Sequence, residues 1–165
     1  MADHPGPDDA VRIDAVGFDH PDAVALRAAH EAFGDSLYAS DPASVHRFTS
    51  EVLDPASVLL TVVAYVGDRP VGHACIRALD GSMAGELEIK RMYVDPDARG
   101  RGVADALLAA VEQRARDEGV PRVVIHTGDR QLAALRFYDR HGYTPIDVFA
   151  PYEEVTYSRC FEKVL

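Results

Sequence analysis

Cysteine, basic charge and long apolar runs are all scarce in this 165-residue chain. The two cysteines, Cys75 and Cys160, are too few for a disulfide framework and are not spaced as a metal clip. Lysine and arginine number 17 against 27 aspartates and glutamates, and a net charge of −10 argues against a nucleic-acid partner, whose phosphates need a basic surface. No apolar stretch approaches the roughly 20 residues of a membrane span. We therefore expect neither nucleic acid nor a membrane as a partner.

The amino-terminal residues 1–10 lack the basic and apolar parts of a secretory signal. They predict a loose polar leader, and a cytoplasmic protein is the default expectation. The composition as a whole is 47% apolar and 27% charged, an ordinary globular balance. Without an internal repeat or a linker, the length fits a single domain over residues 1–165.

Hydrophobic periodicity predicts strands and helices along most of the chain. Residues 41–54 fit either a short helix or a substrate-side loop. The expected strands are Val11–Val16, Val58–Val66, 71–79, 86–94 and 123–127, with one or two more within 144–165. The expected helices run from Asp22 to Leu37, with Pro21 just ahead as a start signal, from Val103 to about Gly119, and over 132–141, the last stopped by Gly142. This order implies an α+β fold with a mixed, mostly antiparallel sheet of six to seven strands flanked by helices.

Strict alternation gives the strand at 86–94 two distinct faces. One face is expected to carry Leu87, Ile89, Arg91 and Tyr93. The opposite face is expected to carry Glu86, Glu88, Lys90 and Met92.

The segment 95–104, Asp-Pro-Asp-Ala-Arg-Gly-Arg-Gly-Val-Ala, joins this strand to the next helix. A helix start presents unpaired N–H groups and the positive end of the helix dipole. Gly100 and Gly102 would let the main chain approach a phosphate closely, and Arg99 and Arg101 add positive charge. The segment therefore predicts a phosphate-bearing ligand, with a solvated basic turn as the alternative.

Two familiar phosphate loops do not fit this segment. A dinucleotide fingerprint would need a third glycine where Asp105 stands, and no Gly-Lys-Ser/Thr of a Walker loop is present. The strand followed by Arg99-x-x-Gly102-x-Ala104 and a helix instead resembles the signature of the GNAT superfamily of N-acetyltransferases. Two further segments resemble the same family: 91–96, Arg-Met-Tyr-Val-Asp-Pro, and 134–143, Ala-Leu-Arg-Phe-Tyr-Asp-Arg-His-Gly-Tyr. The resemblance extends from about Val11 onward.

The resemblance implies a GNAT-like acyl-CoA N-acyltransferase fold that uses acetyl-CoA and no metal. Met92 and Val94 would offer backbone N–H groups to the oxyanion beside a strand bulge, and Gln131 stands where the family often has asparagine. The cofactor-binding residues that it implies are Met92, Tyr93, Val94, Arg99, Gly100, Arg101, Gly102, Val103, Ala104 and Gln131.

Two catalytic candidates follow from the same resemblance. Glu88 is the candidate base, four residues before Met92 on the expected shared face; the alternative is that it only pairs with Lys90 or a cross-strand cation. Glu86 is the reserve, and a water relay would make either indirect. Tyr138 is expected beside the thioester sulfur as the acid, or else is a packed aromatic.

The sequence thus predicts an acetyl-CoA-dependent N-acetyltransferase that acetylates a primary amine directly in a ternary complex. A mid-strand Cys75 disfavours a covalent acyl-enzyme, while His73 and His126 are expected as core or rim residues. The alternatives are a non-catalytic acyl-CoA-binding sensor module, and O-acylation or transfer of a longer acyl group. Small-molecule and protein amines both stay open as partners, as does a homodimer, which is common in the family.

Overall fold

A computed structural model describes residues 10–40 and 53–165 of the chain, so the leader and nearly all of the ambiguous 41–54 stretch lie outside the described residues. Within the described part, the predicted order of strands and helices is confirmed, with short 3₁₀ turns added between some of them. The elements are β1 Val11–Val16, α1 Pro21–Leu37, β2 Val58–Val66, β3 Arg69–Ala78, β4 Leu87–Val94, α3 Val103–Asp117, β5 Arg122–Gly128, α4 Leu132–Arg140, β6 Thr144–Ile146 and β7 Ser158–Val164. No helix among them is long and apolar enough to cross a membrane.

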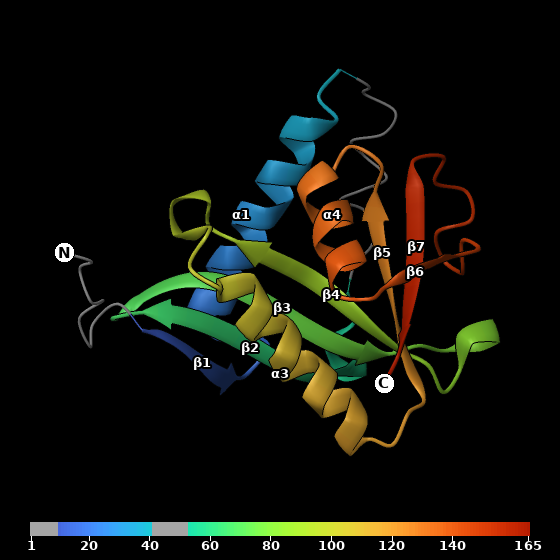
Figure 1. Ribbon diagram of the computed structural model, residues 1–165, viewed down its shortest axis with the longest axis horizontal. Helices are drawn as coiled ribbons and strands as arrows, with labels where there is room; N and C mark the ends of the chain where they lie inside the picture. Colours follow the sequence, from blue (N-terminus) through green and yellow to red (C-terminus); the bar gives the residue numbers. More distant parts are fainter. Residues whose placement is uncertain (1–9, 41–52) are drawn as a thin grey trace.

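The described strands form one seven-stranded sheet in the order β1-β2-β3-β4-β5-β7-β6. Every neighbouring pair is antiparallel except β4 and β5, which confirms the mixed, mostly antiparallel sheet. The parallel pairing is short: only Leu87–Ile89 of β4 meets Val123–Ile125 of β5. Beyond this point the two strands diverge, which Figure 1 shows as a wedge-shaped opening between their arrowheads. We call this opening the splay.

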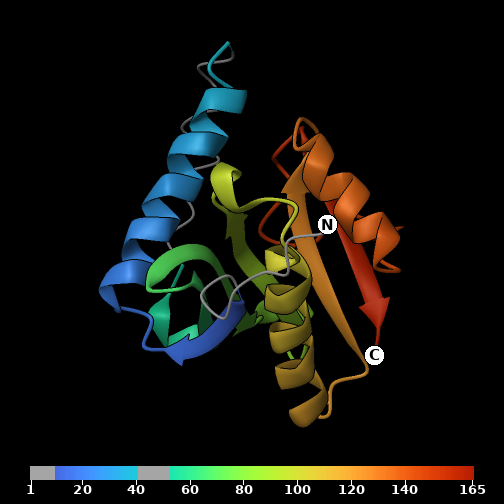
Figure 2. The ribbon, with the colours of Figure 1, turned by 60° about the vertical axis from the view of Figure 1, so that its left-hand side comes forward.

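Helices α1 and α3 cover opposite faces of the strands β1 to β4 (Figure 2). Alternate residues of β2 supply both cores, because a strand points successive side chains to opposite faces. Val63 packs with Ala23 and Leu26 of α1, whereas Val62 packs with Leu107 of α3. The nearly continuous apolar run of β2 therefore serves a strand that is buried on both sides.

A β-bulge interrupts the alternation of β4. His73 of β3 pairs with Tyr93 and Cys75 pairs with Lys90, so β4 has one more residue than β3 between these two pairings. Arg91, inside the bulge, has φ of 54°, a left-handed conformation that is uncommon for a residue with a side chain. The extra residue turns every later side chain of β4 to the opposite face.

The bulge makes the predicted faces of β4 wrong for Met92 and Tyr93. Met92 packs with Leu87 and Ile89 in the core beneath α3, and Tyr93 packs in the core beneath α1. Glu88, hydrogen-bonded to Arg77 on β3, keeps its place on the α1 face and so does not share a face with Met92. Sequence alternation could not detect this, because an inserted residue leaves no mark in an apolar pattern of this length.

His73 links the bulge to α1. Its Nδ1 lies 2.8 Å from the carbonyl oxygen of Arg91, and its Nε2 lies 3.2 Å from Nη1 of Arg27. A carbonyl only accepts, so Nδ1 carries the proton and Nε2 accepts from the guanidinium. Burial lowers the pKa of this fully buried ring to about 4, so the neutral form that this pairing needs is stable at pH 7. Arg27 also donates to the carbonyl of Phe18 at 2.6 Å, which completes the link.

The close approach of α3 to β3 yields a stability prediction. A Cβ at Gly72 would lie 2.9 Å from Leu107 and from Val103 and 3.1 Å from the carbonyl oxygen of Tyr93. Gly72→Ala should therefore overpack this contact and lower the free energy of unfolding by about 1–3 kcal/mol in urea titrations.

Gly17→Ala is the matched control. Its Cβ would approach Asp19, also at 2.9 Å, but the contact is with a carboxylate oxygen of a flexible surface side chain that can move away. Equal stability of the two variants would contradict the packing between α3 and β3.

Candidate functional site

The loop before α3 is shaped by two glycines. Gly100 and Gly102 have φ of 78° and 76°, which glycine adopts without the strain that a side chain would cause. Gly102 is the N-cap of α3 and has no side chain to accept from the first amides of the helix. The N–H groups of the first turn are thus left for an anion, and the helix dipole adds a favourable potential.

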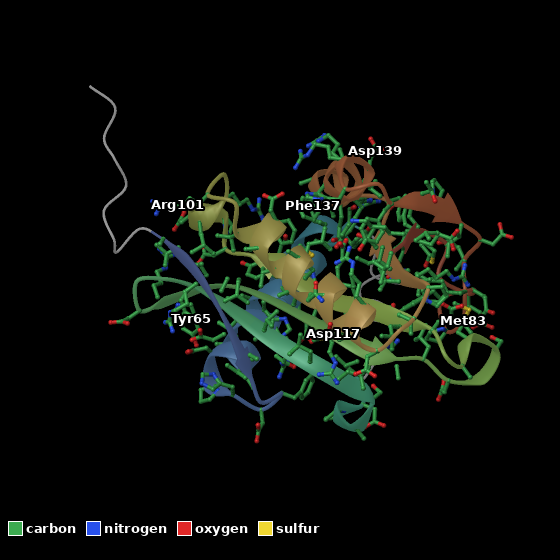
Figure 3. The ribbon with its side chains drawn as sticks, turned by 60° about the horizontal axis from the view of Figure 1, so that its bottom comes forward. Tyr65, Met83, Arg101, Asp117, Phe137 and Asp139 are labelled. Carbon is green, nitrogen blue, oxygen red and sulfur yellow. The ribbon has the colours of Figure 1, made fainter. Side chains whose placement is uncertain are left out.

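These amides border a cavity of about 600 Å³, which we call the loop cavity. It lies between the end of β4, the loop, α1 and α4. Nine of the ten predicted cofactor residues line it: Met92, Tyr93, Val94, Arg99, Gly100, Gly102, Val103, Ala104 and Gln131. Arg101 is exposed and is not among the described lining residues; Figure 3 shows it near the start of α3, on the same edge of the molecule as Phe137 of α4, which does line the cavity.

Arginines dominate the charged groups around the loop cavity. Arg99, Arg130, Arg136 and Arg140 line it, against a single carboxylate among the described lining residues, that of Asp105. In a chain of net charge −10, this concentration favours a polyanionic ligand. Sequence reasoning missed the last three arginines, although the spacing of Arg136 and Arg140 by four residues places them on one side of a helix.

A second cavity of about 380 Å³ opens where β4 and β5 stop pairing, and we call it the splay cavity. Its walls come from both diverging strands, from α1 and α4, and from the segment before β7. The polar residues that line it are His30, Lys90, Arg91, His126, Thr127, Gln131, Tyr138, Tyr152, Glu154 and Tyr157.

The two cavities meet at a shared wall, which we call the junction. Five residues line both cavities: His30, Met92, Gln131, Ala134 and Tyr138. The Tyr138 hydroxyl lies 3.7 Å from the sulfur of Met92, which places the α4 tyrosine directly beside the bulge. Burial raises the pKa of Tyr138 above its usual range, so the phenol stays protonated at neutral pH.

Glu88 lies in a buried polar network instead of at a cavity wall. Its fully buried carboxylate accepts from Nε of Arg77, its cross-strand neighbour, at 2.8 Å and from the Tyr152 hydroxyl at 2.6 Å. Lys90 Nζ donates to the same hydroxyl at 2.5 Å. Glu88 is not among the described residues that line either cavity, whereas Tyr152 lines the splay cavity. Tyr152 comes from a stretch without a recognisable motif, so sequence reasoning could not pair the two.

The other residues that the sequence analysis considered for the chemistry have partners or surroundings that do not favour a catalytic role. Glu86 accepts from Arg122 at 2.9 and 3.1 Å, just before the first residue of β4 and on the far side of the paired segment from the splay. His126 stacks on Tyr152 with centroids 3.7 Å apart, at the rim of the splay cavity. Cys75 is fully buried in β3, and burial raises its thiol pKa to about 12, so it is not a thiolate nucleophile at neutral pH.

Similar structures place this architecture among the acyl-CoA N-acyltransferases. A protein of that description from Klebsiella pneumoniae superposes with a TM-score of 0.75 at 30% identity, covering 94% of this chain and 97% of its own. The sequence profile of the Acetyltransferase (GNAT) family matches residues 25–143. The chain belongs to the GNAT family.

Individual relatives agree with this assignment to different extents. The uncharacterised N-acetyltransferase YedL of Escherichia coli is 30% identical over 142 residues, which cover 85% of this chain and 86% of YedL. The PaiA N-acetyltransferase of Thermoplasma acidophilum, solved with coenzyme A, shares the fold with a TM-score of 0.69 at 14% identity, over 94% of this chain and 99% of PaiA. Human N-acetyltransferase 8 is 35% identical over 50% of this chain, but the match spans only 34% of the human protein. The match to the IAA acetyltransferase of Azospirillum brasilense, 35% identical over 47% of this chain, likewise spans about half of that relative, 51%.

The uncapped start of α3 yields a binding prediction. Gly102→Glu should abolish binding of coenzyme A, measured by titration calorimetry, because the side chain would stand over the amides and repel phosphate. The fold should persist, since a Cβ at Gly102 meets no atom within 4 Å.

Gly81→Glu is the matched control, because Gly81 also has a positive φ (57°) and a Cβ there would likewise have open space around it, but it lies in the turn before β4. Both variants bear the same backbone strain, and only Gly102→Glu should lose the ligand. Normal coenzyme A binding by Gly102→Glu would show that the phosphate site lies elsewhere.

Proposed function

We propose that this protein transfers an acetyl group from acetyl-CoA directly to a primary amine in a ternary complex. The observation that carries the proposal is the junction: a cavity rich in arginine and a second cavity between diverging strands share one wall, which contains Met92 and Tyr138. A cofactor held in the loop cavity and an amine held in the splay cavity would meet there. Acetyl-CoA is a co-substrate in this proposal, and no metal takes part.

The loop cavity suits the charged part of acetyl-CoA. Its pyrophosphate would accept from the amides at the start of α3, and the arginines of the loop and α4 would neutralise the remaining phosphate charge. The pantetheine arm would then run along β4 toward the bulge, where the N–H groups of Met92 and Val94 are our candidates for the oxyanion hole. The PaiA N-acetyltransferase of Thermoplasma acidophilum, which shares this fold, was solved with coenzyme A, and this supports coenzyme A as the kind of ligand.

The attacking amine must lose a proton, because an alkyl ammonium has a pKa of about 10. We keep Glu88 as the proton acceptor and place Tyr152 between it and the amine, since Tyr152 lines the splay cavity and its hydroxyl donates to Glu88. The ammonium first gives a proton to the Tyr152 oxygen while the Tyr152 proton moves to Glu88, which frees the lone pair on nitrogen. The nitrogen–carbon bond then forms, and the nitrogen of the tetrahedral adduct loses its second proton to solvent.

The carbon–sulfur bond then breaks and releases a thiolate. Tyr138 would donate a hydrogen bond to the departing sulfur. Because burial raises the pKa of Tyr138, full proton transfer to a thiolate of pKa near 8.5 is uphill. The phenol therefore stabilises the thiolate by hydrogen bonding, and solvent protonates it. The buried, protonated thiol of Cys75 favours this direct route over an acyl-cysteine.

A non-catalytic acyl-CoA-binding module is the second candidate. The ion pair of Glu88 with Arg77 favours it, because a carboxylate fixed by a buried cation can be purely structural. O-acylation and a longer acyl group are further variants of the same scaffold. We propose that the acceptor is a small-molecule or protein amine and that the protein is cytoplasmic. Sedimentation analysis would measure its assembly state.

A thiol-release assay separates the two candidates. Acetyl-CoA is incubated with the protein and a panel of amino acids, polyamines, aminoglycosides and a lysine peptide, and calorimetry measures acetyl-CoA binding in parallel. Binding with amine-dependent release of coenzyme A supports the transferase. Binding without release from any amine supports the module, and absence of binding contradicts both.

Tyr138→Phe tests the hydrogen bond to the sulfur. The variant keeps the ring in the core but loses the hydroxyl, so kcat should fall about 10²-fold while the Kd for acetyl-CoA stays nearly unchanged. The reason is that the donor acts only as charge develops on sulfur.

Tyr143→Phe is its control, since Tyr143 is buried in the same core and its hydroxyl donates to Glu112 at 3.0 Å instead of facing a cavity. It should lower stability and leave kcat unchanged. Loss of acetyl-CoA binding in Tyr138→Phe, in step with kcat, would assign Tyr138 to packing.

Tyr152→Phe tests the proton route. It keeps the stack on His126 and the Glu88–Arg77 pair, whereas Glu88→Gln would leave a buried guanidinium unpaired and cost about 3–5 kcal/mol of stability. We expect kcat/KM of Tyr152→Phe to fall about 10²-fold at pH 7 and to recover toward the wild-type value above pH 9, where more of the amine is already neutral. A loss of equal size at every pH would exclude Tyr152 from proton transfer.

A further inference from the structure

His30 on α1 lines both cavities at the junction, opposite the α4 side from which Tyr138 approaches. The imidazole stacks on the Tyr93 ring, with centroids 5.7 Å apart and planes inclined by 27°. Tyr93 is one residue after Met92, so the stack fixes the imidazole next to the bulge. The ring thus borders the space where the two substrates would meet.

The Nδ1 atom of His30 is buried and has no hydrogen-bond partner; in the described part of the chain, only two other side-chain atoms share this condition. His73, a fully buried histidine beside the bulge, shows the usual arrangement, with Arg91 and Arg27 as partners for its two nitrogens. A buried polar atom without a partner destabilises a fold, and here it also leaves the imidazole without a hydrogen bond of the kind that fixes the tautomer of His73. Because the His30 ring lines both cavities, a ligand that reaches it from the junction would supply that missing constraint.

We propose that His30 accepts a hydrogen bond from the N–H of the acceptor amine and so directs the nitrogen lone pair toward the thioester carbon. The inference rests on the proposed function. Three observations support it: His30 lines both cavities, its ring stacks on Tyr93, and its Nδ1 lacks a partner. No covalent bond to His30 forms, and the amine proton still leaves by way of Tyr152.

The surroundings of His30 suit a hydrogen-bond acceptor and not a general base. Burial, followed by the neighbouring Arg91, His73 and Lys90, lowers the pKa of His30 to about 3. Glu31 of α1 pairs with Arg91 at 3.6 Å, and Glu88 lies 3.8 Å from Lys90, so both cations are themselves held in place. A ring that stays neutral across the working pH range can orient an amine but does not keep its proton.

The test compares His30→Leu with His30→Asn, two nearly isosteric side chains that differ in their polar atoms. The probe amine is the one in the panel that the wild-type protein acetylates fastest. His30→Leu should lower kcat about tenfold or more, with the Kd for acetyl-CoA unchanged and a Tm no lower than that of the wild type, because an unpartnered polar atom has been removed. His30→Asn should recover part of kcat through its carbonyl oxygen. His73→Leu is the stability control, and its Tm should fall because Arg27 and the Arg91 carbonyl lose their partner.

Each alternative outcome contradicts the inference in a recognisable way. Equal kcat values for the Leu and Asn variants, or a kcat of His30→Leu at the wild-type level, would show that the amine does not use this ring. A drop in Tm of His30→Leu as large as that of His73→Leu would assign His30 to the fold. If the wild type acetylates an amine and these results appear, only the role of His30 falls; if the wild type acetylates none of the panel, the proposed function falls and the inference with it.

Discussion

The hydrogen bond from His73 to the carbonyl of Arg91 is the interaction on which the site depends. It holds a left-handed residue in the middle of a buried strand, and the resulting bulge reverses the faces of β4 at the point where β4 leaves β5. Arg27 extends the link to α1 and so fixes the helix that carries His30. One neutral, buried imidazole thus connects the sheet, the splay and a wall of the junction.

The reversal of faces divides the site between the two sides of the sheet. Met92 and Tyr138 belong to the core beneath α3, whereas Glu88 lies on the other side with Tyr152. A single regular strand would have placed Glu88 and Met92 together, as alternation predicted. The splay cavity joins the two sides because backbone pairing is absent there, so Tyr138 from one side and Tyr152 from the other border the same cavity.

Charge is unevenly distributed over the molecule. The chain is strongly acidic, yet arginines from the loop after β4 and from α4 gather around the loop cavity. Asp105 of α3 and His141, just after α4, lie 2.8 Å apart and tie together the two helices that flank this cavity. A basic cavity on an acidic molecule favours a polyanionic ligand over other solutes. Membership of the GNAT family is consistent with this pattern.

The sequence by itself determined the order of the elements, the mixed sheet and the glycine loop at the start of α3, because hydrophobic periodicity, caps and glycine conformations are local properties. Its resemblance to the GNAT family also identified nine of the residues that line the loop cavity, and all of them except Gln131 lie in β4, in the loop or at the start of α3. The resemblance to the GNAT family implied a bulge beside Met92 and Val94, but only the tertiary structure decided that it reverses the faces of β4. The tertiary structure also decided the pairing of Glu88 with Arg77 and Tyr152, the arginines of α4 and the position of His30. These features depend on strand register and on contacts between residues far apart in the chain, such as Glu88 and Tyr152, and no local pattern encodes such a contact.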